Sequence, residues 1–102
     1  NFSPVLAQAQ AFTPGIQNSG ATADGIALFS APASSITATL VPIDAVIYGT
    51  NNVSNLIDAT GAVGTPAVGD AGSAHSIERT ATGWRVQTTP TPGNCTSATT
   101  TP

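Results

Sequence analysis

Glycine and proline interrupt this sequence so often that no long regular element can form. The 102 residues include 10 Gly and 8 Pro, and only short stretches lie between them. Proline has no backbone N–H to donate, and glycine adopts turn conformations without steric cost, so both residues end helices and strands. A chain of this length builds one domain with a modest core. The sequence therefore predicts one all-β domain of short strands.

Six segments have the composition of strands. Residues 2–12 alternate small apolar residues with Gln8 and Gln10, although Ala and Gln also favour helix. The other segments are rich in β-branched and apolar residues, and the last two flank a turn at Thr82–Gly83 as in a hairpin. A long loop is predicted over 50–72. These five further strand segments are 25–29, 35–41, 43–48, 76–80 and 84–88.

Short strands with Gly/Pro turns at this chain length favour a β-sandwich. We predict that the sandwich spans residues 1–93, of which 1–20 form an opening segment, and that 94–102 form a Thr/Pro-rich tail. Repeated prolines favour extended, solvated backbone, so the tail is expected to be a linker or a glycosylated stalk. The predicted core consists of Ile26, Leu28, Ile36, Leu40, Ile47, Trp84 and Val86.

Charged side chains are scarce, and this limits the partners of the chain. They make up 7% of the residues, against roughly 25% in a typical soluble domain. Arg79 and Arg85 are the two basic residues, and the formal net charge is -3. Binding to nucleic acid requires several phosphate-neutralising side chains, so we predict no nucleic-acid partner. An anionic membrane surface is disfavoured for the same reason, and no apolar stretch is long enough for a membrane helix.

The sequence also lacks a convincing set of catalytic or metal-binding residues. His75 and Ser76 are adjacent on a predicted strand, so their side chains point to opposite faces. Asp44 and Glu78 could form a carboxylate pair, but a solvated or turn-capping role is expected. One His and one Cys do not make a zinc site, and the Asn-rich loop 51–58 has one carboxylate where calcium needs several. We predict Asx turns in that loop, and no enzyme activity, cofactor or metal.

Arg79 and Trp84 lie on the two arms of the predicted hairpin. A guanidinium over an indole ring makes a favourable cation–π contact. We expect this contact to be structural, with Trp84 as an anchor of the core or its edge.

Three Asn-X-Ser/Thr sequons begin at Asn1, Asn52 and Asn94, a mild excess over chance. Attached sugar would supply the solubility that the few charges do not. Cys95 is the single cysteine, so it forms an intermolecular disulfide in an oxidising compartment or remains a free thiol. The chain begins at Asn1 rather than Met, as expected after removal of a leader or for one piece of a longer product. An extracellular or cell-surface location is predicted.

Five short motifs follow one another along the chain, at Asp24–Phe29, Ile43–Gly49, Ser76–Thr80, Gly83–Trp84 and Pro90–Gly93. In this order they resemble the lamin-tail domain of bacterial exported proteins. They cover about residues 24–93, and the resemblance implies an immunoglobulin-like sandwich with a non-enzymatic role, often as an addition to exported proteins. The family's opening strands, with their Glu-Leu-Tyr-Asn-like pattern, have no counterpart here, so strands from a neighbouring chain or segment are expected to complete the sandwich. Chromatin association is not expected, because the basic surface is absent.

The resulting hypothesis is a non-catalytic extracellular structural module, a glycosylated subunit of a surface or filamentous assembly. Its expected partner is another copy, or another chain that supplies missing strands. Residues 5–11 either insert into a neighbour or form a strand of their own domain. The alternative function is an accessory domain, cut from a larger secreted hydrolase, that binds glycan or cell wall. A third interpretation is an enzyme fragment.

Overall fold

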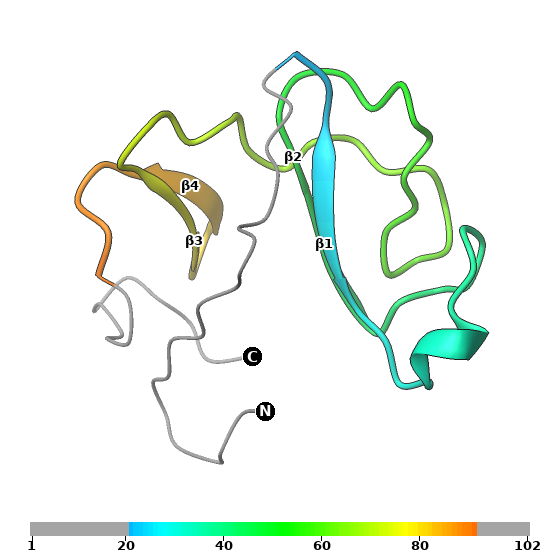
Figure 1. The fold of residues 1–102 in the computed structure, drawn as a ribbon. Helices are drawn as coiled ribbons and strands as arrows, with labels where there is room; N and C mark the ends of the chain where they lie inside the picture. Colours follow the sequence, from blue (N-terminus) through cyan, green and yellow to red (C-terminus); the bar gives the residue numbers. More distant parts are fainter. Residues whose placement is uncertain (1–20, 92–102) are drawn as a thin grey trace. The chain divides into compact units, whose positions relative to one another are not determined.

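The computed structural model describes residues 21–91, which form two small antiparallel sheets with almost no helix (Figure 1). This confirms the all-β prediction. The described residues belong to two compact units, 21–70 and 71–91, and each is considered by itself. The predictions for 2–12, the tail 94–102, Asn1, Asn94 and Cys95 lie outside the described residues. The elements are β1 (Asp24–Leu28), the 3-10 helix η1 (Ala33–Ser35), β2 (Asp44–Tyr48), β3 (Ser76–Thr80) and β4 (Gly83–Gln87).

The first unit is built on the antiparallel pair β1–β2, in which Asp24 lies opposite Tyr48 and Leu28 opposite Asp44. The edge of β2 that does not pair with β1 is partly covered, because the N–H of Ala67 donates to the carbonyl of Ile47 at 2.8 Å. The core of this unit is small. It consists of Ala23 and the last three residues of β2, Val46, Ile47 and Tyr48, each less than 10% exposed.

Gly49 ends β2 in a conformation that only glycine adopts readily. Its φ is +108°, and its N–H donates to the carbonyl of Val68 at 2.9 Å. A Cβ at this position would lie 3.0 Å from the carbonyl oxygen of Thr22 and 3.1 Å from the Cα of Ala23. The absence of a side chain therefore lets the segment before β1 pass close to the end of β2.

The predicted loop over 50–72 contains isolated bridges but no strand, and Asn52 organises it. The Asn52 Oδ1 accepts the N–H of Leu56 at 2.9 Å, and its Nδ2 donates to the carbonyls of Leu56 and Gly64 at 2.9 and 2.7 Å. Asp58 forms an Asx turn by accepting the backbone N–H of Thr60 at 2.8 Å. An Asx turn was predicted for the Asn residues of this loop, but Asp58 forms it, and Asn52 instead bonds across the loop to Leu56 and Gly64.

The second unit is the hairpin β3–β4, which confirms the predicted pair of strands. The turn residues are Ala81 and Thr82, one position earlier than predicted, because Gly83 already pairs with Thr80 as the first residue of β4. Gly83 has a φ of +128°, and the Thr80 hydroxyl donates to its carbonyl at 2.9 Å. Glycine and this side-chain bond together close the turn.

The predicted strand over 35–41 is wrong. Its first residue ends the helix η1, which begins directly after Pro32, and residues 38–39 form a turn before Pro42. The alternation of Ile36, Ala38 and Leu40 would bury a face only against a second layer. Within residues 21–70 no strand pairs with this segment, so the two prolines and the helical turn decide its conformation.

The predicted core is wrong at three of its seven positions. Of its seven members only Ile47 is fully buried, whereas Leu40, Trp84 and Val86 are half-buried. The remaining three are exposed because each described sheet has two strands, and two strands cannot cover both of their own faces. The exposed members are Ile26, Leu28 and Ile36, at 46%, 60% and 41%.

Candidate functional site

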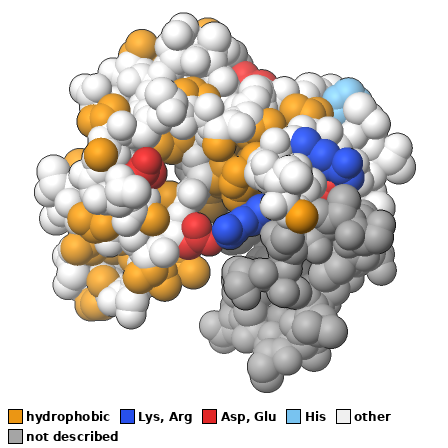
Figure 2. Space-filling view, turned by 180° about the vertical axis from the view of Figure 1, so that it is seen from behind, with side chains coloured by type: hydrophobic (Ala, Val, Ile, Leu, Met, Phe, Trp, Pro, Cys, Tyr) orange, Lys and Arg blue, Asp and Glu red, His pale blue; other side chains and the backbone are white. Residues whose placement is uncertain are grey.

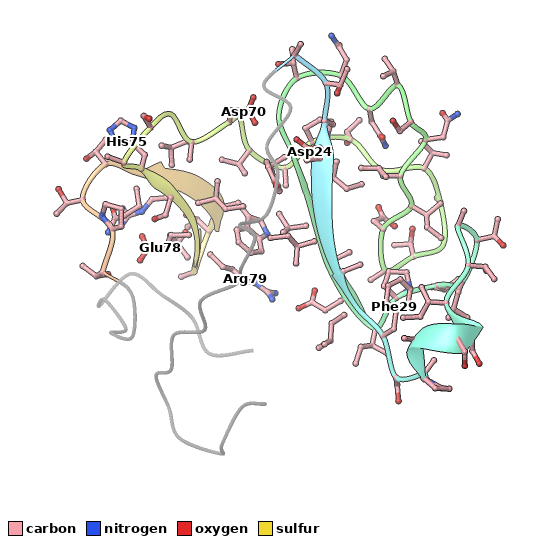
Figure 3. All side chains as sticks on the ribbon, in the orientation of Figure 1. Asp24, Phe29, Asp70, His75, Glu78 and Arg79 are labelled. Atoms are coloured by element: carbon pink, nitrogen blue, oxygen red, sulfur yellow. The ribbon has the colours of Figure 1, made fainter. Side chains whose placement is uncertain are left out.

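An open apolar hollow lies beside β1 in residues 21–70. Its volume is about 240 Å³, and we call it the β1 groove. One wall comes from β1 and β2, including Ile26 and Val46, and the others come from the segments 37–42 and 54–57. Phe29 lines the groove directly after the end of β1 (Figure 3). A recess with apolar walls and few polar groups is typical of a site that accepts apolar side chains.

Seven large apolar side chains of residues 21–70 are exposed, and Ile26 among them lines the β1 groove. Hydrophobic atoms are spread over the same unit in Figure 2. Leu28 and Ile43 lie together at one end of β1, where the Ile43 N–H donates to the Leu28 carbonyl at 2.9 Å. Exposed apolar groups that gather on one unit mark interaction surfaces more often than isolated ones do. The complete set is Ile26, Leu28, Ile36, Val41, Ile43, Val53 and Val63.

The outer edge of β1 adds hydrogen-bonding capacity to this surface. Among the described residues, β1 pairs with β2 on one side and with no strand on the other. Backbone groups of alternate residues on such an edge point outward, where they can pair with another chain. Four of the five β1 residues, from Gly25 to Leu28, are exposed.

A buried tyrosine with two acidic neighbours lies at the opposite end of the same sheet. Burial raises the pKa of the Tyr48 phenol, and the negative charges of Asp24 and Asp70 raise it further. Figure 3 shows both carboxylates near the start of β1. The Asp70 Oδ1 is buried and has no hydrogen-bond partner among the described residues. In residues 21–91 no three acidic, His or Cys side chains are grouped as metal ligands.

Tyr48 should make the protein less stable in alkali. Because its folded pKa lies above the unfolded value near 10, the unfolded chain loses this proton first as the pH rises. The stability that Tyr48 contributes is therefore complete below about pH 10 and is lost as the pH rises through the folded pKa. Urea unfolding at increasing pH should show this decline.

The composition of the chain leaves few other groups that titrate at alkaline pH. It contains one Tyr and no Lys, so Tyr48 is the main group that titrates in this range. The test is done in a Cys95→Ser background, and Tyr48→Phe is the matched variant. A decline of equal size in the Tyr48→Phe protein would contradict the assignment.

The hairpin brings two of the predicted residues together. Arg79 and Trp84 are opposite each other in the β3–β4 register, as expected of cross-strand neighbours. The same register places Glu78 opposite Arg85, and this ion pair was missed. The Glu78 Oε2 accepts from the Nε and Nη2 of Arg85 at 2.9 and 2.8 Å. The signal was present in the sequence, since any register that pairs 79 with 84 also pairs 78 with 85.

The other candidate residues are not gathered into a site. Asp44 is on β2 and Glu78 is on β3, in different sheets of different units. His75 is exposed and precedes β3, whereas Ser76 is half-buried on the strand (Figure 3). These positions offer no arrangement for acid–base or nucleophilic chemistry within either described unit.

Asn52 is the one sequon asparagine within the described residues. Both hydrogens of its side-chain amide point to carbonyls, those of Leu56 and Gly64. A glycan attached to Nδ2 would replace one of these hydrogens, so one of the two bonds would be lost. Glycosylation at Asn52 stays a prediction, with this structural cost attached to it.

A second hollow lies at the turn end of the hairpin, within residues 71–91. Its volume is about 280 Å³, and we call it the hairpin-end hollow. Residues of the turn and of the adjoining ends of β3 and β4 line it. The lining residues are Thr80, Ala81, Thr82, Trp84 and Arg85.

No family model matches this chain, and no curated protein or solved structure is similar to it. The resemblance to the lamin-tail domain therefore rests on the sequence motifs. Across residues 21–91, no helix has the length and apolar character needed to cross a bilayer.

Proposed function

We propose that this chain is a non-catalytic extracellular structural module that works as a subunit of a surface or filamentous assembly. In this proposal an immunoglobulin-like sandwich, of the kind the lamin-tail resemblance implies, is completed by strands from a neighbouring chain or segment. The observation that carries the proposal is the exposure of β1. It presents Ile26 and Leu28 to solvent beside a strand edge that no other described strand covers.

The energetics of small sheets support the need for a partner. A two-stranded sheet is at best marginally stable in water, and three or more strands are needed for independent stability. The buried core of residues 21–70 has four members. Covering a half-exposed Ile or Leu stabilises an assembly by about 1 kcal/mol for each side chain. A strand added to β1 would therefore supply both hydrogen bonds and apolar burial.

The mechanism of assembly is the addition of a strand to the edge of β1. Main-chain hydrogen bonds supply affinity, and alternate side chains of the added strand enter the β1 groove. When donor and acceptor surfaces lie on different parts of one chain, the contact is head-to-tail and propagates as a filament. The predicted strand 5–11 is the proposed donor.

The remaining features agree with an exported, inert role. The chain has few charges and many small polar residues, so attached glycan would increase its solubility. Cys95 is the proposed site of a disulfide to another chain. His75, Ser76, Asp44 and Glu78 form no catalytic arrangement within the two described units. Glycosylation and a disulfide between chains are both compatible with the proposed extracellular location.

Ile26→Lys should reduce assembly without unfolding the domain. The side chain is 46% exposed, so a lysine can reach solvent in the monomer but would be buried without a partner in the added-strand complex. We expect sedimentation velocity to shift from large species to monomers, with a loss of association of about tenfold or more.

The matched control is Ala59→Lys, which adds the same charge at an exposed turn position away from the β1 groove. Thermal unfolding of both variants checks that the fold is retained. If wild type and Ile26→Lys sediment identically over a wide concentration range, β1 is not the assembly surface.

A second candidate function is binding of glycan, as in an accessory domain of a secreted hydrolase. The hairpin-end hollow favours it, because its lining residues include Trp84 and two threonines. This candidate does not depend on assembly through β1.

A further inference from the structure

We infer that β1 accepts a strand from a second copy of the chain through the backbone groups of two residues, Gly25 and Ala27. This contact rests on the proposed function, since it is the step by which one subunit joins the next. In a β-strand the N–H and C=O of one residue point to the same side, and successive residues point to opposite sides. The groups that face away from β2 can therefore be assigned residue by residue.

A hydrogen bond on the edge of β2 that does not pair with β1 fixes this alternation. The Ile47 carbonyl accepts from the N–H of Ala67 at 2.8 Å, so the backbone groups of Ile47 point away from β1. Ile47 lies opposite Gly25, and two residues directly opposite in an antiparallel pair either face each other or both face away. The backbone groups of Gly25 therefore point to the outer edge of β1, and alternation places those of Ala27 on the same edge.

The residues between and after these two point the other way. The Leu28 carbonyl accepts from the N–H of Ile43 at 2.9 Å, directly before the start of β2. This second bond gives the same alternation, with the backbone groups of Ile26 and Leu28 directed to β2. The outer edge thus offers the N–H and C=O of Gly25 and of Ala27. Within residues 21–91, no backbone bond from a turn or loop reaches these four groups.

Small side chains at these two positions leave room for another backbone. Gly25 and Ala27 are both exposed, and neither carries more than a methyl group. A glycine within a strand is typical of a place where another backbone approaches closely. The larger side chains, Ile26 and Leu28, lie on the opposite face of β1, where they are 46% and 60% exposed. One added strand would therefore pair with the edge and also shield these two side chains.

The segment 5–11 of a second copy fits this edge best. It has the period-two alternation of a strand and contains no proline and no charged residue. The residues that line the β1 groove are also uncharged, so no ion would be desolvated when this segment is buried there. The other segment with strand composition that forms no strand, 35–41, already contributes residues to the wall of the groove.

Ala27→Pro should abolish assembly and leave the monomer folded. Proline removes the N–H of residue 27, and its ring takes the place of an incoming carbonyl. A proline is accepted on an edge strand when the lost N–H faces solvent. We expect sedimentation velocity to show association weakened at least tenfold. The matched control is Ala45→Pro on β2, because the Ala45 N–H donates to the Asp44 Oδ1 at 2.9 Å. This control should assemble as wild type.

Hydrogen exchange of the wild-type chain tests the same assignment without a substitution. In dilute monomers, the amides of Gly25 and Ala27 should exchange fast and those of Ile26 and Leu28 slowly. In assembled protein, the first two should become protected at least tenfold. Protection of Gly25 and Ala27 in the dilute monomer would show that the chain covers its own edge, and the inference would then be wrong.

A mixture of two variants identifies the partner segment. Ala27→Pro keeps the proposed donor and lacks the acceptor. The double variant Gln8→Pro/Ala9→Pro keeps the acceptor and lacks the donor, because successive prolines remove an N–H on each side of the strand. Neither protein should assemble alone, whereas the mixture should form heterodimers and no filaments. A mixture that stays monomeric would overturn the assignment of residues 5–11 as the partner.

Failure of this inference can be distinguished from failure of the proposed function. If Ile26→Lys prevents assembly while folded Ala27→Pro assembles as wild type, the edge contact is wrong and assembly through the β1 surface stands. If the wild-type chain stays monomeric at every concentration, both proposals are overturned.

Discussion

Gly49→Ala should destabilise the protein by about 2–5 kcal/mol, the largest effect that we expect from any single methyl group. Two costs act at this position. Ala at a φ of +108° is strained by about 1–3 kcal/mol. The new Cβ would also lie 3.0 Å from the Thr22 oxygen and 3.1 Å from the Ala23 Cα, both backbone atoms that cannot rotate away.

Ala23 is one of the four buried core residues, with 4% of its surface exposed. A shift of its backbone away from the new Cβ would therefore disturb the packing of the core. The measurement is urea or thermal unfolding of the full chain. Gly69→Ala is the matched control in the same unit, since its Cβ would meet nothing within 4 Å and its φ is not positive. We expect that control to be neutral or slightly stabilising. Equal stability of the two variants would show that the turn at Gly49 is not constrained as described.

Asn52→Ala should cost about 2–4 kcal/mol. The side chain makes three hydrogen bonds, which connect Leu56 and Gly64 across the loop. A net bond contributes about 1 kcal/mol, and an unsatisfied part-buried partner adds to the loss. Without Asn52, the N–H of Leu56 and the carbonyl of Gly64 lose this partner at once, whereas the Leu56 carbonyl keeps its bond from the N–H of Gly64.

Asn52→Asp separates the roles of the two ends of this amide. Aspartate keeps an acceptor for the Leu56 N–H but loses both donors, and it places negative charge beside two carbonyl oxygens. We expect it to be no more stable than Asn52→Ala. Chemical unfolding of the three proteins gives the ranking, and wild-type stability of Asn52→Asp would contradict the assigned amide orientation.

Local patterns predicted the elements of this fold well. The segments 25–29 and 43–48 are strands within one residue, and the hairpin at 76–80 and 84–88 is correct apart from its turn. Each of these segments is a short β-branched run bounded by turn residues, and neighbouring residues alone determine such a run. An Asx turn was expected in the loop 51–58 from residue type, but it is made by Asp58, and the bonds of Asn52 to Leu56 and Gly64 were not expected.

Burial could not be predicted in the same way. Ile26 and Leu28 alternate like core residues, yet their exposure depends on which strand covers β1, and no local pattern contains that information. The segment 35–41 has the alternation of a strand but no partner within residues 21–70, so a 3-10 turn after Pro32 prevails. The same holds for the candidate site, since within residues 21–70 no further strand lies against β1 beside the β1 groove.

The order in which the two sheets form follows from their connections. A turn of Ala81 and Thr82 joins β3 to β4, so this hairpin can close in about 1–10 μs. Residues 29–43 separate β1 from β2, and closing a longer loop costs more chain entropy. We therefore expect the β1–β2 pair to form after the β3–β4 hairpin. Its edge is then open to a neighbouring chain while folding is incomplete, and the rate of β1–β2 closure sets the protein concentration at which association competes with folding.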